Sequence, residues 1–462
     1  MMARRTFRSG PSGASFLGTL PRARKGALRC ATIVAVLAGV CAAWTARAQL
    51  KIVVTSGVTD PIPIAVVPFA SADPSAPNAG SDVAGVVQND LTGSGRFRTM
   101  PRDQMRATPS QAADVVLADW RANGNDYVVV GRVSPLGGGQ LAVDFQLLNV
   151  LNGEQLANQR FTGPPSALRD AAHRVSDVIY EKILGIRGAF ATRIAYVAVE
   201  GKPPAQRYQL VVADADGANP HVVLESHQPV MSPAWSPDGN WLAYVSFENR
   251  HSSIYVQQVR TGERRLVSAR VGTNGAPSWS PDGRKLALTL GGSNGNLDVY
   301  VLDLASQQLT RVTDDPAIDT EPVWAPDGRS LYFTSDRGGG PQIYEIGLEP
   351  GARPKRVTFE GTYNARPRIS PDGTQLAMVT LDNGNYDIAV QDLASGTVRI
   401  LSHGRLDTSP SFAPNGAMLI YAATVNGRGV LQRCSVDGFT SQQLASEHED
   451  VRDPVWGPFS HP

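Results

Sequence analysis

One short phrase occurs six times in the C-terminal half of the chain, most fully as Pro233-Ala-Trp-Ser-Pro-Asp-Gly239. The copies begin at Pro233, Pro277, Pro322, Pro367, Pro410 and, in shortened form, Pro454. These prolines lie 44, 45, 45, 43 and 44 residues apart, and such a period is typical of a radial array of small antiparallel sheets. The repeat therefore predicts a β-propeller with one sheet for each copy.

Each phrase reads as a turn that follows a strand. Proline presets the backbone of one corner, aspartate tolerates the next, and glycine supplies the positive φ that closes the hairpin. A large side chain precedes each turn, and we expect it to pack against the neighbouring sheet rather than to offer a carbohydrate platform. These side chains are Trp235, Trp279, Trp324, Ile369, Phe412 and Trp456.

The two ends of the array complement each other. Residues 193–199, 208–213 and 221–224 supply three strands of a first blade, but no phrase precedes them. The shortened copy at 454–459 supplies the missing strand, and its pairing with the first blade would remove exposed strand edges. We therefore expect an all-β six-bladed β-propeller over residues 194–462, closed by pairing of its N- and C-terminal strands.

The first 48 residues have the pattern of a secretory signal peptide. Seven basic residues precede a short apolar stretch, residues 31–43, and Ala46-Arg47-Ala48 offers a cleavage site between Ala48 and Gln49. A retained membrane anchor and a lipoprotein are the alternatives, but the apolar stretch is short for a membrane span. The interpretation predicts export and no transmembrane segment in the mature chain.

Removal of the signal changes the charge balance. It takes away eight basic and no acidic residues, which leaves 35 basic and 42 acidic residues and a net charge of about −7. A nucleic-acid partner is therefore not expected. Cys434 becomes the single cysteine, so no intrachain disulfide can form, and we expect it to be a small buried apolar residue.

Residues 49–185 predict an α+β N-terminal domain, joined to the propeller by a linker at 186–193. Strands are expected at 64–69 and 127–131, with a hairpin of 140–150 and 154–162 around Asn152-Gly153. Apolar residues at helical spacing predict three helices over one sheet. The expected helices are 83–91, 112–120 and 167–184, the last ended by Gly185.

A search for chemical motifs predicts no catalytic, cofactor-binding or metal-binding residue. Gly291-Gly-Ser-Asn-Gly295 matches a hydrolase pattern, but it lies between two strands instead of at a strand-to-helix turn. Asp214-Ala-Asp216-Gly217 lacks the further carboxylates of a calcium loop. The residue pairs read as innermost strands, such as Ala234-Trp235 and Val323-Trp324, contain no carboxylate. These observations favour a protein that is not an enzyme.

The chain resembles the TolB family, the periplasmic propeller proteins of the Tol-Pal envelope system of Gram-negative bacteria. The resemblance rests on Ile52–Gly57, Pro63–Phe69, Gly185–Phe190 and the Trp-Ser-Pro-Asp-Gly blades, in this order along the chain. It covers essentially all of the mature sequence. The blade phrase alone is weaker evidence, because propellers of prolyl-oligopeptidase-type peptidases share it.

The resemblance implies two protein-binding surfaces. The loops that enter the innermost strands would bind the peptidoglycan-associated lipoprotein Pal, through Thr273, Asn274, Ala276, Thr320 and Glu321. Some family members carry His where Thr273 stands. The mature N-terminus would act as a mobile strand that binds TolA, and its β-branched residues suit the edge of a partner's sheet. This segment is Gln49, Leu50, Lys51, Ile52, Val53, Val54, Thr55, Ser56, Gly57, Val58 and Thr59.

The function predicted from the resemblance is that of a monomeric periplasmic adaptor without cofactors. It would support outer-membrane integrity and invagination during cell division, with outer-membrane porins as possible further partners. The alternatives are a secreted propeller hydrolase or lactonase and a periplasmic glycan-binding module. An ordinary first strand of the N-terminal domain is the alternative for residues 49–59.

Overall fold

The computed structural model describes residues 60–73, 76–292, 295–444 and 450–460, all within one compact unit, Leu50–Pro462. The predicted signal peptide, its cleavage pair Ala48 and Gln49, and the predicted TolA-binding segment 49–59 lie outside the described residues. None of the described helices is long and apolar enough to cross a membrane.

The N-terminal domain contains one mixed sheet. Its strand order is β3-β1-β4-β5-β6, and the short β2 pairs with β4. Strand β1 is parallel to β3 and β4, whereas β4, β5 and β6 form an antiparallel meander. The strands are β1 (Ile62–Val66), β2 (Ala70–Ser71), β3 (Phe97–Thr99), β4 (Tyr127–Pro135), β5 (Leu141–Asn149) and β6 (Gln155–Gly163).

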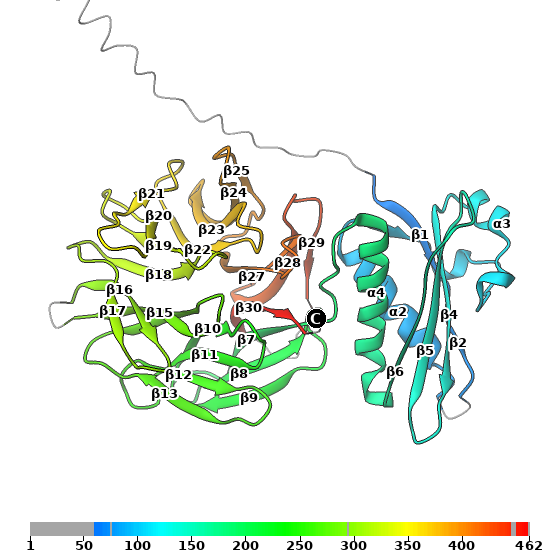
Figure 1. The fold of residues 1–462 in the computed structure, drawn as a ribbon, viewed down its shortest axis with the longest axis horizontal. Helices are drawn as coiled ribbons and strands as arrows, with labels where there is room; N and C mark the ends of the chain where they lie inside the picture. The colour runs from blue at the N-terminus through cyan, green and yellow to red at the C-terminus, as the bar shows by residue number, and fades with distance from the viewer. Residues whose placement is uncertain (1–59, 74–75, 293–294, 445–449, 461–462) are drawn as a thin grey trace, which may run out of the picture. The chain divides into compact units, whose positions relative to one another are not determined.

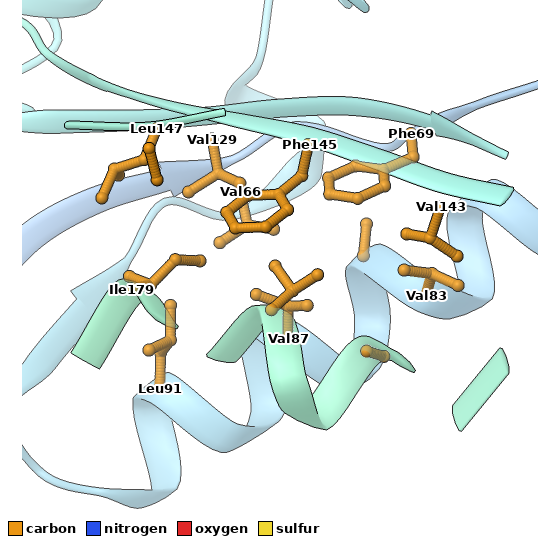
Figure 2. Packing of buried hydrophobic residues seen from close by; sticks show 14 of the residues in the cluster. Val66, Phe69, Val83, Val87, Leu91, Val129, Val143, Phe145, Leu147 and Ile179 are labelled. Atoms are coloured by element: carbon orange, nitrogen blue, oxygen red, sulfur yellow. The ribbon is translucent and has the colours of Figure 1, made fainter. Parts of the chain in front are cut away.

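Helices α2 (Ala79–Gly93) and α4 (Leu168–Leu184) cover one face of this sheet (Figure 1). Phe145 of β5 points from the sheet toward Val87 of α2, and Ile179 of α4 closes the same apolar layer (Figure 2). Helix α4 ends as predicted at Gly185, which has a φ of 71° and caps the helix in the left-handed conformation.

One predicted helix is wrong in part. Residues 112–120 do not form a continuous helix, but a 3₁₀ turn, η2 (Ala112–Asp114), followed by the short α3 (Leu117–Ala122). Val115 and Val116 between them have extended backbones, and β-branched side chains of this kind lose rotamer freedom in a helix. Trp120 of α3 packs on the other face of the sheet. The remaining 3₁₀ turns are η1 (Arg102–Gln104) and η3 (Pro165–Ala167).

Six four-stranded antiparallel sheets follow and form the blades of a propeller (Figure 1). The innermost strands are β10 (Val230–Trp235), β14 (Asn274–Trp279), β18 (Asp319–Trp324), β22 (Asn364–Ile369), β26 (Thr408–Phe412) and β30 (Val451–Phe459). The second strands are β11 (Trp241–Ser246), β15 (Lys285–Gly291), β19 (Ser330–Ser335), β23 (Gln375–Asp382), β27 (Met418–Val425) and β7 (Thr192–Glu200).

The fourth strand, at the edge of each blade, is the shortest strand of its sheet. The third strands are β12 (Ser253–Gln258), β16 (Leu297–Asp303), β20 (Gln342–Gly347), β24 (Asn385–Asp392), β28 (Arg428–Ser435) and β8 (Arg207–Asp214). The fourth strands are β13 (Arg264–Ser268), β17 (Leu309–Arg311), β21 (Lys355–Arg356), β25 (Val398–Ile400), β29 (Ser441–Gln443) and β9 (His221–Ser226). Cys434 is fully buried, as expected for an apolar role.

The phrase residues hold the blades together, as predicted. The indole Nε1–H of Trp279 donates to the carbonyl of Ala234 in the preceding blade at 3.2 Å. Trp324 repeats this bond to Ser278 at 3.1 Å. The turn glycine also packs on the preceding blade, since a Cβ added at Gly283 would lie 3.8 Å from Pro237. The tryptophan and the turn glycine of a phrase therefore both contact the blade before it.

The predicted closure of the ring is confirmed. Strand β30 from the C-terminus pairs with β7, and the sheet order is β30-β7-β8-β9. Trp456 donates its indole N–H to the hydroxyl of Thr192 at 2.8 Å. Strand β7 begins at Thr192 rather than at residue 194, because Thr192 pairs with Phe459. Residues 192 and 193, predicted as linker, thus belong to the first blade.

Candidate partner-binding face

The strand directions give the propeller two different faces. The phrase turns and the turns between third and fourth strands lie at one end of every blade, here called the turn face. The connections from each fourth strand to the next innermost strand lie at the other end, here called the entry face. Its described connections include 269–273, 312–318, 357–363 and 401–407. The predicted Pal-binding residues lie at this entry face.

The innermost strands bulge at one repeated position, the residue before the first proline of each phrase. At this position six non-glycine residues have positive φ, between 44° and 57°: Ser232, Ala276, Glu321, Arg366, Ser409 and Asp453. A register shift lies at the same point of each pair. Left-handed backbone costs a non-glycine residue on the order of 1–3 kcal/mol, so the architecture must impose it.

All six of these residues line a cavity of about 190 Å³ surrounded by the innermost strands. Arg366 is the centre of its charge network. Its guanidinium lies 3.0 Å from Glu321 and 3.2 Å from Asp453. Burial lowers the pKa of Arg366, but the two carboxylates outweigh it and raise this pKa overall. The channel is therefore cross-linked by ion pairs between three different blades.

The structure corrects the prediction that the innermost strands carry no carboxylate. These strands begin several residues before the pairs read from the sequence, and they include Asp319, Glu321 and Asp453. Asp319 is fully buried and is held by Arg337 at 2.7 Å. Burial raises the pKa of Asp453, but Arg366 outweighs this effect and the pKa is lowered overall. Each of these carboxylates thus has an arginine partner.

Arg368 adds a further cation to the channel lining. Its guanidinium donates to the carbonyl of Pro367 at 2.8 Å. Burial is the largest effect on its pKa and lowers it. Together with Arg366, this residue balances the charges of Glu321 and Asp453, so that the channel mouth carries both signs of charge.

The five predicted Pal-binding residues do not have equal access to solvent. Thr273 is exposed at the end of its loop, and Ala276 and Glu321 line the channel mouth. Thr320 is half-buried, with its hydroxyl 3.3 Å from that of Thr289. Glu321 also binds Thr289, through its backbone N–H at 3.1 Å. The structure thus brings Ala276, Thr320 and Glu321 to one rim.

Asn274 differs from the other predicted residues because its side chain is fully buried. Its Oδ1 accepts from the hydroxyl of Ser268 at 2.6 Å and from the N–H of Arg270 at 3.0 Å. Its Nδ2 donates to the carbonyls of Arg270 and Gly272. Asn274 therefore shapes the loop that presents Thr273, and its side chain is not available for a direct contact.

Sequence reasoning missed a set of exposed apolar side chains on the entry face. Four connections between blades each carry one: Val271, Ile318, Phe359 and Leu406, which are 88, 47, 62 and 45% exposed. Exposed apolar side chains on one face of a protein are typical of protein-binding surfaces. The sequence does not single these residues out, because three of the four connections hold a further large apolar residue, such as Val312 or Leu401, and the distance from the phrase varies between blades.

The turn face carries the contacts with the N-terminal domain. Arg96 lies 2.5 Å from Asp437, which is in the turn after β28. Asn415 of a phrase turn donates to the carbonyl of Arg187 at 2.9 Å. Arg169 of α4 pairs with Asp216 in the turn after β8. These contacts lie on two neighbouring blades of the turn face, and none of them involves the entry face.

A buried polar cluster lies among these contacts. Asp90, His173 and Asp216 have ligand-type atoms within 4.8 Å of one another. The Nδ1 of His173 lies 2.7 Å from Asp90, and Arg169 already pairs with Asp216. Burial lowers the pKa of His173, but Asp90 and Asp216 outweigh it and raise this pKa to about 9. With an arginine on the third member, the cluster is an ion-pair network rather than an open metal site.

Family models and known relatives give a consistent result. Residues 180–460 match the model of the TolB beta propeller domain, and residues 50–156 match that of the TolB amino-terminal domain. The chain belongs to the TolB family. The resemblance seen in the sequence is thereby confirmed, including the order of the two domains.

Similar proteins cover nearly all of the chain. Tol-Pal system protein TolB of Methylococcus capsulatus is 50% identical over 420 residues, 90% of this chain and 96% of the relative. The protein of the same name from Alcanivorax borkumensis is 48% identical over 416 residues, 90% of this chain and 94% of the relative. The crystal structure of TolB from Acinetobacter baumannii has a TM-score of 0.80 at 42% identity, covering 86% of this chain and 97% of that one.

Proposed function

We propose that this protein is a non-enzymatic adaptor of the Tol-Pal system in the periplasm. Its entry face would bind the lipoprotein Pal, and residues 49–59 would bind TolA. The observation that carries the proposal is the entry face itself, whose connections carry exposed Val271, Ile318, Phe359 and Leu406 and whose channel is lined by both signs of charge. In the cell, this function would support outer-membrane integrity and invagination during division.

Protein recognition suits this face better than catalysis. The carboxylates of the channel are paired: Glu321 and Asp453 with Arg366, and Asp319 with Arg337. A hydrolase would need a nucleophile beside a general base, and the described residues of the channel lining offer neither a His nor a Cys. The tryptophans of the phrases are half-buried or buried between blades, which disfavours a glycan platform.

A pull-down from periplasmic extract tests the Pal surface. Ala276→Arg and Thr320→Arg should abolish recovery of Pal, because a long cation would fill the rim that these small residues leave open. Arginine already occupies the equivalent backbone position at Arg366, so Ala276→Arg should fold normally. Thr261→Arg, exposed in a turn-face loop, is the matched control and should retain Pal. Equal recovery with all three variants would refute the proposal.

The second surface has its own test. Deletion of residues 49–59 should abolish binding of the TolA C-terminal domain and leave Pal binding intact, because none of the residues proposed to bind Pal belongs to this segment. Loss of both partners would instead indicate that the segment is an ordinary strand on which the fold depends.

A further inference from the structure

A buried polar triad recurs where one blade meets the next on the entry face. Each triad joins a residue near the start of a third strand, a hydroxyl residue at or just after the fourth strand, and the residue three positions before the next phrase. All its members are at most 7% exposed. The triads are Ser253, Ser268 and Asn274; Asp298, Thr313 and Asp319; Gln342, Thr358 and Asn364; and Asp387, Ser402 and Asp407.

The first three triads need no added cation. Two of their buried atoms, Ser253 Oγ and Asn364 Oδ1, lack a hydrogen-bond partner among the described residues, but both belong to neutral side chains. In the third, Asn364 donates its Nδ2–H to Gln342 Oε1 at 2.9 Å, and Thr358 donates to the same oxygen at 2.7 Å. The second contains two carboxylates, and each has an arginine. Arg311 lies 2.6 Å from Asp298, and Arg337 lies 2.7 Å from Asp319.

The fourth triad has the same two carboxylates without either arginine. Ile400 stands where Arg311 stands in the second triad. Val425 stands where Arg337 stands, since each lies nine residues after the turn glycine of its blade, Gly416 or Gly328. Asp387 and Asp407 are each 2% exposed, and the Oδ1 of each lacks a hydrogen-bond partner among the described residues. A pair of buried carboxylates without a cation is costly, because each is removed from water and repels the other.

The main chain is fitted closely around this pair. The N–H of Gly404 donates to Asp407 Oδ2 at 3.1 Å. A Cβ at Gly404 would lie 2.2 Å from Asp407 Oδ1, which only glycine avoids. The backbone N–H of Asp407 donates to the carbonyl of Tyr386 at 2.8 Å and fixes the two strands together.

We propose that Asp387 and Asp407 form a binding site for a calcium ion at the boundary of the fourth triad. The ion would supply the positive charge that Arg311 and Arg337 supply in the second triad. Oxygen donors without nitrogen or sulfur suit a hard cation, and the irregular loop suits calcium better than the strict octahedron of magnesium. In the first and third triads the asparagine donates to the carbonyl four residues earlier. The equivalent carbonyl here is that of His403, which we expect to be a third ligand.

The pair has an alternative to calcium, because burial favours protonation of both carboxyl groups. Burial, followed by repulsion from Asp407, raises the pKa of Asp387 to about 6. Burial also raises the pKa of Asp407. The exposed His403 lowers both pKa values, and Asp382 raises that of Asp387. Without calcium, the alternative is therefore a shared proton, and the experiment must separate the two.

The test is a calorimetric titration of the full mature chain with CaCl₂ after removal of metal by EDTA. One ion should bind, with a Kd on the order of 10⁻⁴–10⁻³ M as in extracellular calcium modules. Saturating calcium should raise the Tm by about 2 °C or more at a pH well above 6. Asp387→Asn and Asp407→Asn should each weaken binding at least about tenfold. Asp407→Asn should fold, because the equivalent residue of the third triad, Asn364, already carries an amide.

Controls make each outcome decisive. Asp314→Asn removes an acid on the same face whose side chain is 83% exposed, and it should bind calcium as the unchanged protein does. Loss of binding in Asp453→Asn but not in Asp387→Asn would place the ion in the channel and overturn the proposal. The proposal would also be overturned if calcium did not bind and the Tm fell as the pH rose through about 6, because a proton shared by the two carboxyl groups would behave in this way. If the variants do not fold, hydrogen exchange of the unchanged protein provides the test. Slower exchange of residues 401–407 in the presence of calcium would support the site, and unchanged exchange would contradict it.

Discussion

Closure of the ring by β30 gives the most demanding test of the fold. Removal of residues 453–462 would leave Ala195, Ile194 and Thr192 of β7 without their partners in β30. It would also remove Trp456, which is 7% exposed and bonded to Thr192. The sheet of the first blade would then present an open edge in the middle of the ring.

The tryptophan alone sets a lower limit for the loss. Truncation of a buried tryptophan to alanine typically costs about 3–5 kcal/mol, and a lost hydrogen bond about 1 kcal/mol. The two losses together, about 4–6 kcal/mol, should lower the Tm of Trp456→Ala by roughly 8–24 °C. The deletion should lower the free energy of unfolding by more than this. Its cost should approach the total stability of a domain, which is about 5–15 kcal/mol. Trp456→Phe keeps most of the ring and should lose only about 1 kcal/mol.

Calorimetry and circular dichroism during heating measure these changes. The expected order of Tm is unchanged protein, Trp456→Phe, Trp456→Ala and the deletion. A deletion variant that melts within about 2 °C of the unchanged protein would refute the closure, because the lost strand would then carry less than about 1 kcal/mol.

Three further predictions concern residues away from the closure. His173 is held charged by Asp90, with its pKa raised from 6.5 to about 9, so its stabilisation is complete below pH 6.5 and is lost as the pH rises to about 9. His173→Gln should flatten the decline in Tm over that range, and an unchanged decline would contradict the assignment. Asn274→Ala should cost about 1–3 kcal/mol in urea unfolding and speed amide exchange at Arg270, and a cost below about 0.5 kcal/mol would contradict its role in the loop. Arg366→Met should cost about 1–2 kcal/mol, less than the roughly 3–5 kcal/mol of a fully buried pair, because its side chain is 40% exposed; an equal unfolding midpoint in urea would show that the channel pairs contribute nothing.

The repeats made the propeller predictable in detail. The position of Trp235 before its turn, and the absence of a phrase before residue 193, were sufficient to predict the contact between blades and the closing strand. Both inferences depend on backbone pairing, which a period of about 44 residues constrains strongly. The helix at 112–120 failed because Val115 and Val116 fit a helical pattern of apolar residues but not the backbone of a helix.

The candidate site was less predictable, because its properties depend on contacts between blades. The residue before a proline is expected to be extended, yet Ala276 and Glu321 are left-handed because each innermost strand bulges there. The pairing of Arg366 with Asp453 joins residues 87 positions apart. Asn274 lies next to Thr273 in the sequence, but alternation along the strand buries its side chain.

The bulges also explain why the channel rim can vary without loss of the fold. The six residues before the phrase prolines range from Ala276 to Arg366, and all six have the same left-handed backbone. The conformation therefore follows from the propeller geometry and not from any one side chain. Since this backbone cost is the same for most non-glycine residues, exchange of a side chain that makes no ion pair, such as that of Ala276, should leave stability nearly unchanged. Substitutions at this rim can then alter partner binding independently of folding, which is the separation that the Ala276→Arg experiment needs.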